Sequence, residues 1–252
     1  MVAWLAERAE EGAPTLVGLD FPFGYAVPFL DRLGAPDFPA LLARLAPLDG
    51  VSEAPDRVDA FVAGCGRWWA RWGRHRDHRT RRYVERLPAT RGAESPLRAL
   101  RHGRGYGFVG PRQVGRAAIT GIAALALLKE RVPTVRVWPF EDPARASLVL
   151  TEIWPRLALG ALVKSDPAAR QRHVRELGRR GILLRPEHGQ VAAASDHAID
   201  ALAAAVMMAS GDWRLPGPDA LPRESVREGW ILGVEPSLPS NPRKPRRGKE
   251  RS

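Results

Sequence analysis

The sequence predicts an α/β fold in which a mostly parallel sheet is flanked by helices. Three apolar runs, at residues 15–19, 134–138 and 147–154, are too short for helices and are bounded by turn residues, as strands usually are. The stretches between and after these runs carry apolar residues at helical spacing. Strands that alternate with helices are typical of α/β layers, in which helical crossovers join parallel strands.

The first part of the chain predicts one helix and one strand. Residues 2–11 have apolar side chains at helical intervals, and Gly12 and Pro14 end that helix. The continuous apolar run at residues 15–19 predicts a strand that is buried on both faces. This strand ends at Asp20, directly before a Phe-Pro-Phe-Gly turn.

A basic part follows before the sheet resumes. Residues 27–59 are rich in proline and predict short helical pieces. Residues 61–86 predict a helix in which tryptophans are interleaved with arginines, and residues 103–110 form a glycine-rich loop. We interpret residues 27–110 as a basic helical insert within a single domain that spans residues 1–233.

The last part of the chain continues the alternation. Proline residues stop the strands at residues 134–138 and 147–154. A helix over residues 166–180 is charged on one side, and Ser195 is the N-cap of a further helix over residues 196–210.

Two stretches carry weaker signals. Residues 182–184 indicate either a short edge strand or the end of the preceding helix. Residues 234–252 are rich in proline, arginine and lysine, and we expect them to form a disordered basic tail.

The composition excludes several classes of protein. The chain is 44% apolar and 27% charged, as soluble globular chains are. Its single cysteine, Cys65, excludes a disulfide framework and fits a reducing compartment. The longest apolar run has about half of the roughly 20 residues that a membrane helix needs, and early glutamates argue against a signal peptide. We therefore predict a cytoplasmic protein with no membrane partner.

The net charge of +11 is concentrated in two stretches. Residues 67–104 hold twelve arginines against three acidic residues, and residues 241–252 hold six basic residues against one. Clustered positive charge indicates a polyanion partner, although such stretches are often only solvated surface. With nucleic acid as the partner, the arginines expected to contact phosphates are Arg74, Arg76, Arg79, Arg81, Arg82, Arg112 and Arg116.

Asp20 is the first candidate catalytic residue. It lies at the carboxyl end of a predicted strand, and in open α/β sheets ligands bind in the crevice outside the strand ends. An aspartate in front of a Phe-Pro-Phe-Gly sequence can equally serve only to form a turn. Both interpretations stay open at this point.

Asp196 and Asp200 are spaced by one helical turn and therefore share a helix face. Two like charges at that spacing repel each other, and a cation between them would remove the repulsion. Asp196 also has a structural explanation, because an acidic residue in the first turn interacts favourably with the helix dipole. Asp200 lies beyond that turn and lacks this explanation.

Glu152 lies inside the apolar strand at residues 147–154. A buried carboxylate needs a cation, a hydrogen-bond partner or water. With Asp20, Asp196 and Asp200 it forms a set of hard oxygen ligands of the kind that Mg²⁺ or Mn²⁺ prefers. Such sets serve the two-metal hydrolysis of phosphodiester bonds.

Six short motifs occur in the order found in a known family. They are residues 16–24 (LVGLDFPFG), 113–116 (QVGR), 135–141 (VRVWPFE), 151–156 (TEIWPR), 196–202 (DHAIDAL) and 227–233 (REGWILG). Over about residues 1–233 the chain thus resembles the domain-of-unknown-function family numbered 429, whose members are regarded as predicted nucleases with a ribonuclease H-like fold.

This resemblance implies a ribonuclease H-like mixed sheet flanked by helices, with carboxylates that converge on a divalent metal ion. Asp20 matches the aspartate that ends the fourth strand of the family, and Asp196 and Asp200 match acidic positions of its last helix. Glu152 matches the glutamate of the family's Glu-Val-Tyr-Pro element, in which Trp154 replaces the tyrosine.

The sequence departs from the family pattern at its N-terminus. Ribonuclease H-like domains begin with three antiparallel strands, the first of which carries a metal-binding aspartate, whereas this sequence begins at the helix that follows them. We therefore expect the N-terminal three-strand unit to be absent, which would leave an apolar edge on the strand at residues 15–19.

The function predicted from the sequence is that of a metal-dependent nuclease, impaired by the N-terminal truncation. The alternative is a non-catalytic nucleic-acid-binding or scaffold protein with the same fold. The substitution Asp20→Asn separates the two hypotheses. It should abolish cleavage by a nuclease and leave the binding of nucleic acid by a non-catalytic protein unchanged.

Overall fold

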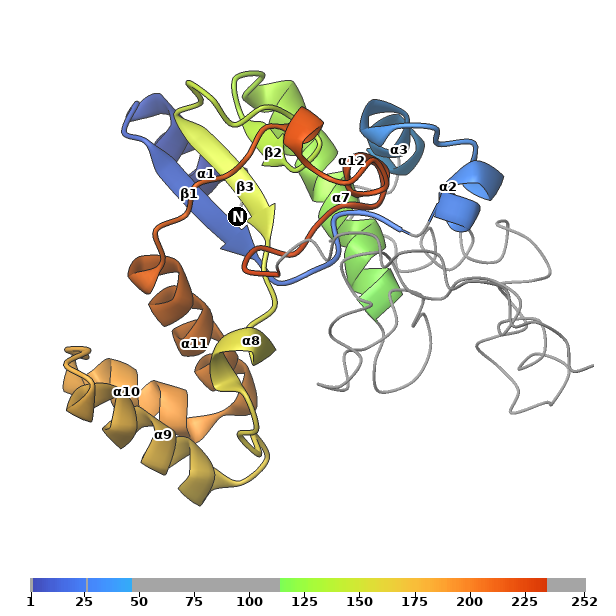
Figure 1. The fold of residues 1–252 in the computed structure, drawn as a ribbon. Helices are drawn as coiled ribbons and strands as arrows, with labels where there is room; N and C mark the ends of the chain where they lie inside the picture. Colours follow the sequence, from blue (N-terminus) through green and yellow to red (C-terminus); the bar gives the residue numbers. More distant parts are fainter. Residues whose placement is uncertain (1, 26, 47–113, 235–252) are drawn as a thin grey trace, which may run out of the picture.

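The computed structural model describes residues 2–25, 27–46 and 114–234 (Figure 1). These residues form a mixed α/β structure in which helices flank a three-stranded parallel sheet, as the sequence predicts. The predicted helix at residues 61–86, the glycine-rich loop at residues 103–110 and residues 235–252 of the tail lie outside the described residues.

The sheet has the strand order β1-β3-β2, with every neighbouring pair parallel. The strands are β1 (Thr15–Leu19), β2 (Arg136–Trp138) and β3 (Leu148–Glu152), which confirms the three strands expected from the sequence. Leu19 is aligned with Glu152 in the register of β1 and β3, so these two strands end at the same edge of the sheet.

The edge strand β1 differs from the central strand β3 in burial. All residues of β3 are buried, whereas all residues of β1 are only half-buried. Leu16 packs against one hydrophobic cluster and Val17 against the other, so both faces of β1 are covered. The prediction of a strand buried on both faces is confirmed only in part, because both faces are covered but every residue of β1 is half-buried. Among the described residues one strand lies beside β1, and its other edge has none.

The larger hydrophobic core lies on one face of the sheet. It is formed with α1 (Val2–Glu10), α2 (Val27–Leu33), α3 (Phe38–Leu45) and α7 (Val114–Arg131), and α7 crosses behind the sheet in Figure 1. Asp37 caps α3 by accepting a hydrogen bond from the backbone of the first turn. Helices α2 and α3 fall within the sequence-predicted insert, yet their buried residues belong to this core.

The opposite face of the sheet is covered by the C-terminal segment. This segment contains the short helices η4 (Pro218–Ala220) and α12 (Ser225–Glu228). Trp230 and Leu232 pack in the hydrophobic cluster on this face. The backbone N–H of Leu232 donates to the carbonyl of Glu152 at 2.8 Å, which holds the segment along the end of β3.

A helical unit lies below the sheet in Figure 1. It consists of α8 (Arg156–Leu159), α9 (Pro167–Arg179), α10 (Pro186–Ala194) and α11 (Asp196–Ser210). Helix α11 begins where the sequence predicts, and the Ser195 side chain accepts a hydrogen bond from its first turn. Helix α10 is an addition to the sequence-based expectation.

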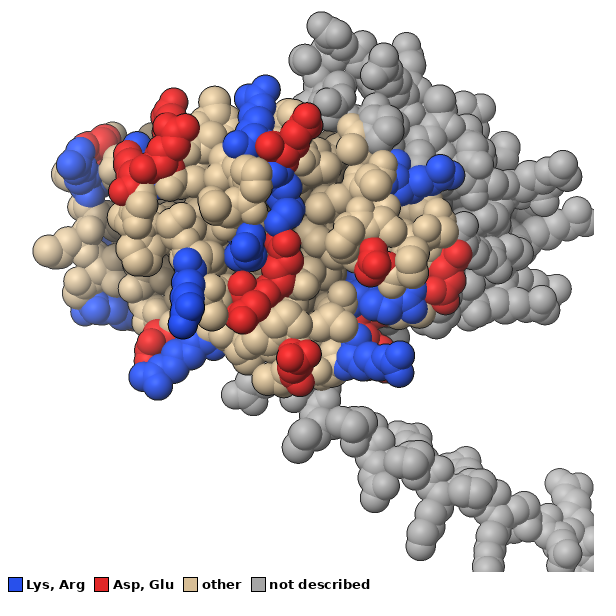
Figure 2. Space-filling view, turned by 90° about the horizontal axis from the view of Figure 1, so that it is seen from above, with Lys and Arg blue, Asp and Glu red and all other residues tan. Residues whose placement is uncertain are grey.

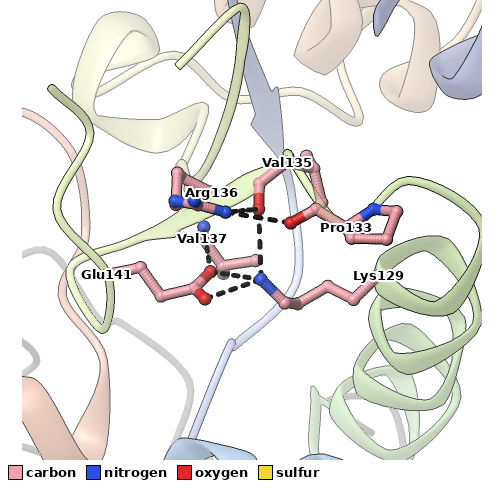
Figure 3. A network of polar contacts seen from close by, with 6 residues as sticks. All are labelled: Lys129, Pro133, Val135, Arg136, Val137 and Glu141. Atoms are coloured by element: carbon pink, nitrogen blue, oxygen red, sulfur yellow. Dashed lines mark hydrogen bonds and ion pairs between the residues drawn. The ribbon is translucent and has the colours of Figure 1, made fainter. Parts of the chain in front are cut away.

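The turn after β2 is fixed by a polar network between this turn and α7 (Figure 3). Lys129 Nζ donates to both carboxylate oxygens of Glu141, at 2.6 and 2.8 Å, and to the carbonyl of Val135 at 3.1 Å. Glu141 Oε2 also accepts a hydrogen bond from the backbone N–H of Val137 at 2.9 Å. Glu141 is therefore a structural turn residue.

The described helices and surface charges have two further properties. Within residues 2–25, 27–46 and 114–234, every helix is too short or too polar to cross a bilayer. Figure 2 shows the face seen from above, on which the basic and acidic side chains of the described residues are interspersed.

Candidate active site at the carboxyl end of the sheet

The parallel register of β1 and β3 brings Asp20 and Glu152 to the same edge of the sheet. Glu152 is the last residue of β3 and is aligned with Leu19, which Asp20 directly follows. The Glu152 side chain is 3% exposed, and its Oε2 accepts a hydrogen bond from the backbone N–H of Phe23 at 3.0 Å. The buried carboxylate thus has the partner that burial requires, and it holds the loop after Asp20.

A second buried glutamate, which sequence reasoning missed, holds the same loop further along. Glu228 Oε1 accepts a hydrogen bond from the backbone N–H of Val27 at 2.8 Å. The loop also approaches α12 closely, since a side chain at Gly24 would collide with the backbone of Glu228. The chain that follows Asp20 is therefore anchored at both ends by carboxylates from distant parts of the sequence.

Asp200 is paired with a lysine. Lys164, in the connection between α8 and α9, forms an ion pair through Nζ with Asp200 Oδ2. Both side chains are partly buried, at 34% and 18% exposure, so water screens the pair less than a surface pair. The sequence analysis considers a cation between Asp196 and Asp200, whereas in the structure the ammonium of Lys164 pairs with Asp200.

Sequence reasoning did not identify Lys164, although a signal for it exists. The chain holds 39 basic residues, of which only Lys129, Lys164, Lys244 and Lys249 are lysines. Both lysines in the described part of the chain form ion pairs with a carboxylate. The ammonium of lysine is a compact point charge, unlike the planar guanidinium, so a lysine in a chain this rich in arginine is a signal for a site of this kind.

Arg170 positions the lysine. Its side chain is buried and donates three hydrogen bonds to backbone carbonyls: Nη1 to Lys164, Nε to Ala193 at 2.8 Å and Nη2 to Ala194 at 3.1 Å. Residues 193 and 194 end α10 just before Ser195, the N-cap of α11. The guanidinium therefore ties the connection that carries Lys164 to the start of the helix that carries Asp200.

The charges around Asp20 show which groups share its neighbourhood. Although part of the residue faces solvent, surrounding protein atoms take its carboxyl partly out of water, and this burial is the main reason that the pKa of Asp20 is raised to about 6. The negative charge of Asp200 also raises this pKa, the positive charge of Lys164 lowers it, and Glu152 raises it. Asp20 thus lies within electrostatic reach of two of the other predicted site residues.

Asp196 stands apart from this group. It is the first residue of α11, its side chain is 55% exposed, and it lies 4.0 Å from Nε2 of the exposed His197. Its charge is not among those that shift the pKa of Asp20. The placement fits the interpretation of Asp196 as a first-turn residue that stabilises the helix dipole.

The carboxylates of the site differ in how well they could bind a divalent cation. In the described part of the chain, no group of three or more His, Cys, Asp or Glu side chains is placed to hold a metal ion. Asp20 and Asp200 offer carboxylate oxygens from two neighbouring elements, and Mg²⁺ often binds one or two carboxylates and keeps several waters. The chemistry of this pair therefore fits one ion with a largely aqueous coordination shell, whereas Glu152 is committed to the loop.

The arginines predicted to bind nucleic acid are not placed by the structure. Arg74, Arg76, Arg79, Arg81, Arg82 and Arg112 lie outside the described residues, and Arg116 belongs to the first turn of α7, where only the backbone is described.

Comparison of the chain with known protein families, with curated proteins and with solved structures finds no match. The chemistry of the site therefore rests on its own groups: two coupled aspartates, a buried glutamate that holds the adjoining loop, and a positioned lysine. Such a set can bind a cation, transfer a proton near neutral pH and neutralise an anionic ligand.

Proposed function

We propose that the chain is a metal-dependent hydrolase of phosphodiester bonds in nucleic acid, built on a ribonuclease H-like fold. The observation that carries the proposal is the gathering of Asp20, Asp200 and Glu152 at the carboxyl end of a parallel sheet. Ligand sites of open α/β sheets lie at this edge, and carboxylates with a shifted pKa are typical of functional sites.

In this proposal Asp20 and Asp200 hold Mg²⁺ or Mn²⁺. A bound divalent ion supplies an activated water and neutralises charge on the leaving oxygen. Asp20 is suited to bind the ion at neutral pH, because its pKa of about 6 leaves most of the carboxyl charged there. A cation between the two aspartates would also relieve the repulsion that contributes to this raised pKa.

Lys164 and Glu152 have supporting roles. Lys164 lies within electrostatic reach of both aspartates, and its ammonium would be able to pair with a substrate phosphate if Asp200 bound a metal ion. Glu152 keeps the loop after Asp20 in place through the backbone of Phe23. Its contribution is therefore to position Asp20.

Nucleic acid is proposed as the substrate because of the distribution of charge along the chain. Residues 67–104 and 241–252 contain all of the basic excess, and the remainder of the chain is slightly acidic. Clustered arginines bind phosphates with little dependence on base sequence, so the proposal leaves RNA and DNA as outcomes of the assay.

The proposal is tested by incubating the purified full chain with Mg²⁺ or Mn²⁺ and labelled single- and double-stranded RNA and DNA. We expect cleavage that chelation abolishes and that Asp20→Asn or Asp200→Asn lowers by about 100-fold. Asp212→Asn is the matched control, because that aspartate is 81% exposed and pairs with Arg214 after the end of α11. Equal cleavage by Asp20→Asn and wild type would contradict the proposed roles.

A second function is favoured by one specific observation. Glu152 and Asp200 already have protein partners, the N–H of Phe23 and the ammonium of Lys164, as expected for purely structural carboxylates. The chain would then be a non-catalytic nucleic-acid-binding protein. In that case the wild type cleaves no substrate, Asp20→Asn binds as well as wild type, and affinity falls steeply with salt.

A further inference from the structure

The hairpin of α9 and α10 carries a groove that the proposed hydrolase does not use. The connection between these helices lies at the left end of the hairpin in Figure 1. The groove has a volume of about 680 Å³ and lies between the two helices and their connection. Neither Asp20 nor Asp200 lines it.

Two local signals hold the connection of the hairpin in an extended form. Gly181 adopts a φ of 80° after the end of α9, and the backbone N–H of Ile182 donates to the carbonyl of Leu177 at 3.0 Å, which closes the helix. Pro186 begins α10 and restricts Arg185 to an extended conformation. The chain between these points is therefore stretched along the groove.

The extended connection presents apolar side chains to solvent. Leu183 is 95% exposed, and Ile182 and Leu184 line the groove beside it together with Val174 of α9. An aliphatic side chain exposed to this degree above an apolar groove is a feature of interaction sites. The groove contains no aromatic side chain, so it lacks the stacking surface that nucleobases need.

Backbone groups are also available along the connection. Within the described ranges, the N–H groups of Leu183 and Leu184 have no hydrogen-bond partner in the protein. An extended segment with free backbone donors can pair with an added strand, which is a common mode of peptide recognition.

The rim of the groove is positive. Arg175 and Arg185 line it, no acidic residue does, and neither arginine has an ion-pair partner in the part of the chain that the structure describes. The neighbouring arginines of α9 differ, since Arg172 pairs with Asp166, and Arg179 pairs with Glu176. The two arginines that face the groove are thus the ones that have no carboxylate partner among the described residues.

We propose that this groove binds a short extended segment of a partner protein, with an aliphatic or aromatic anchor side chain flanked by acidic residues. The anchor packs against Ile182, Leu183 and Leu184 while the backbone pairs with the connection. The flanking carboxylates pair with Arg175 and Arg185. The site is independent of the proposed hydrolase chemistry.

The test is a selection of a random peptide library, displayed on phage, against the immobilised full chain. We expect the selected peptides to combine an apolar anchor with aspartate or glutamate. Synthetic copies of them should bind Leu183→Asp about tenfold more weakly than wild type. Val191→Asp is the matched control, because Val191 is 62% exposed on α10 but does not line the groove, and its effect should stay below about twofold.

A charge reversal sharpens the test. Arg185→Glu should weaken the binding of the acidic peptides. It should strengthen the binding of peptide copies in which lysine replaces the acidic residues. Leu183 and Arg185 are exposed, so their variants should unfold at the wild-type temperature, and a thermal melt checks this. The proposal is overturned if no peptide depends on Leu183, if selected peptides lack acidic residues, or if a single-stranded oligonucleotide displaces them.

Discussion

The sheet region and the α8–α11 helical unit are held together by different kinds of interaction. The sheet packs against a large cluster of fully buried aromatic and aliphatic side chains, such as Phe23, Ile119 and Leu150. The cluster of the helical unit is much smaller and half of its buried members are alanines. There the buried Arg170 and the Lys164–Asp200 pair connect elements that apolar contacts hold only weakly.

The candidate site therefore joins residues of the sheet region, which apolar packing holds, to residues of the helical unit, which polar contacts hold to a larger extent. Asp20 directly follows β1 and Glu152 ends β3, and the register of the sheet sets the positions of both strands. Asp200 and Lys164 lie on the helical unit, whose geometry depends on one guanidinium and the carbonyls that it contacts. Changes of charge should therefore disturb the helical half of the site more than the sheet half.

The largest expected effect is a loss of stability from truncating the central strand. Leu150→Ala removes a fully buried side chain from β3 and should lower the free energy of unfolding by about 3 kcal/mol, because the cavity cannot collapse in a close-packed core. Urea denaturation measures this loss. Val191→Ala, on the exposed face of α10, should change it by less than about 0.5 kcal/mol. An equal loss in both variants would contradict the assignment of the main core.

A smaller and more local effect is expected from removing the guanidinium. Arg170→Met leaves three backbone carbonyls without their donor and should cost about 2 kcal/mol. Hydrogen exchange should become faster in α9, α10 and the start of α11, and stay unchanged in β1 and β3. Arg172→Met is the control, because the Arg172 side chain is 64% exposed. Faster exchange throughout the chain would mean that the two halves unfold as one unit.

The smallest expected effect is electrostatic. Because Lys164 lowers the pKa of Asp20, Lys164→Met should raise this pKa above its value of about 6. Lys129→Met removes a comparable ion pair, with Glu141, and should leave it unchanged. Titration of the Asp20 carboxyl carbon by NMR measures both. An unchanged pKa in Lys164→Met would show that the ammonium does not act on Asp20.

The same pKa gives a dependence of stability on pH. Since the pKa of Asp20 is raised on folding from 3.8 to about 6, the folded state holds its proton more tightly than the unfolded state. The contribution of Asp20 to stability is therefore fully present below pH 3.8 and is lost as the pH rises to about 6. The melting temperature of Asp20→Asn should therefore be higher than that of wild type at pH 7, and this difference should disappear at pH 4.

Local patterns in the sequence were sufficient to predict much of the fold. The apolar runs predict all three strands of the described sheet, and Ser195 predicts the start of α11. Helix α10 was not predicted, because Gly189 interrupts its helical pattern. The exposure of β1 depends on how many strands lie beside it, which is not a property of residues 15–19 themselves.

The candidate site was predictable in part. Asp20 follows from a strand end, Glu152 from its place inside an apolar strand and Asp200 from the spacing of aspartates, and the structure brings them into one neighbourhood. Lys164 and Arg170 were missed because their partners lie far away in the sequence and are, for Arg170, backbone carbonyls that carry no residue-specific signal. Whether Asp196 and the arginines of residues 67–104 take part in function stays a prediction.

The anchoring of the loop after Asp20 has a consequence for biosynthesis. Its two anchors belong to Glu152 and Glu228, which follow Phe23 and Val27 by 129 and 201 residues. A ribosome therefore releases the loop long before it has made the carboxylates that fix it, and contacts of such long sequence separation form late in folding. Translation products that stop before Glu228 would contain every aspartate of the site and still lack one of the two carboxylates that anchor the loop.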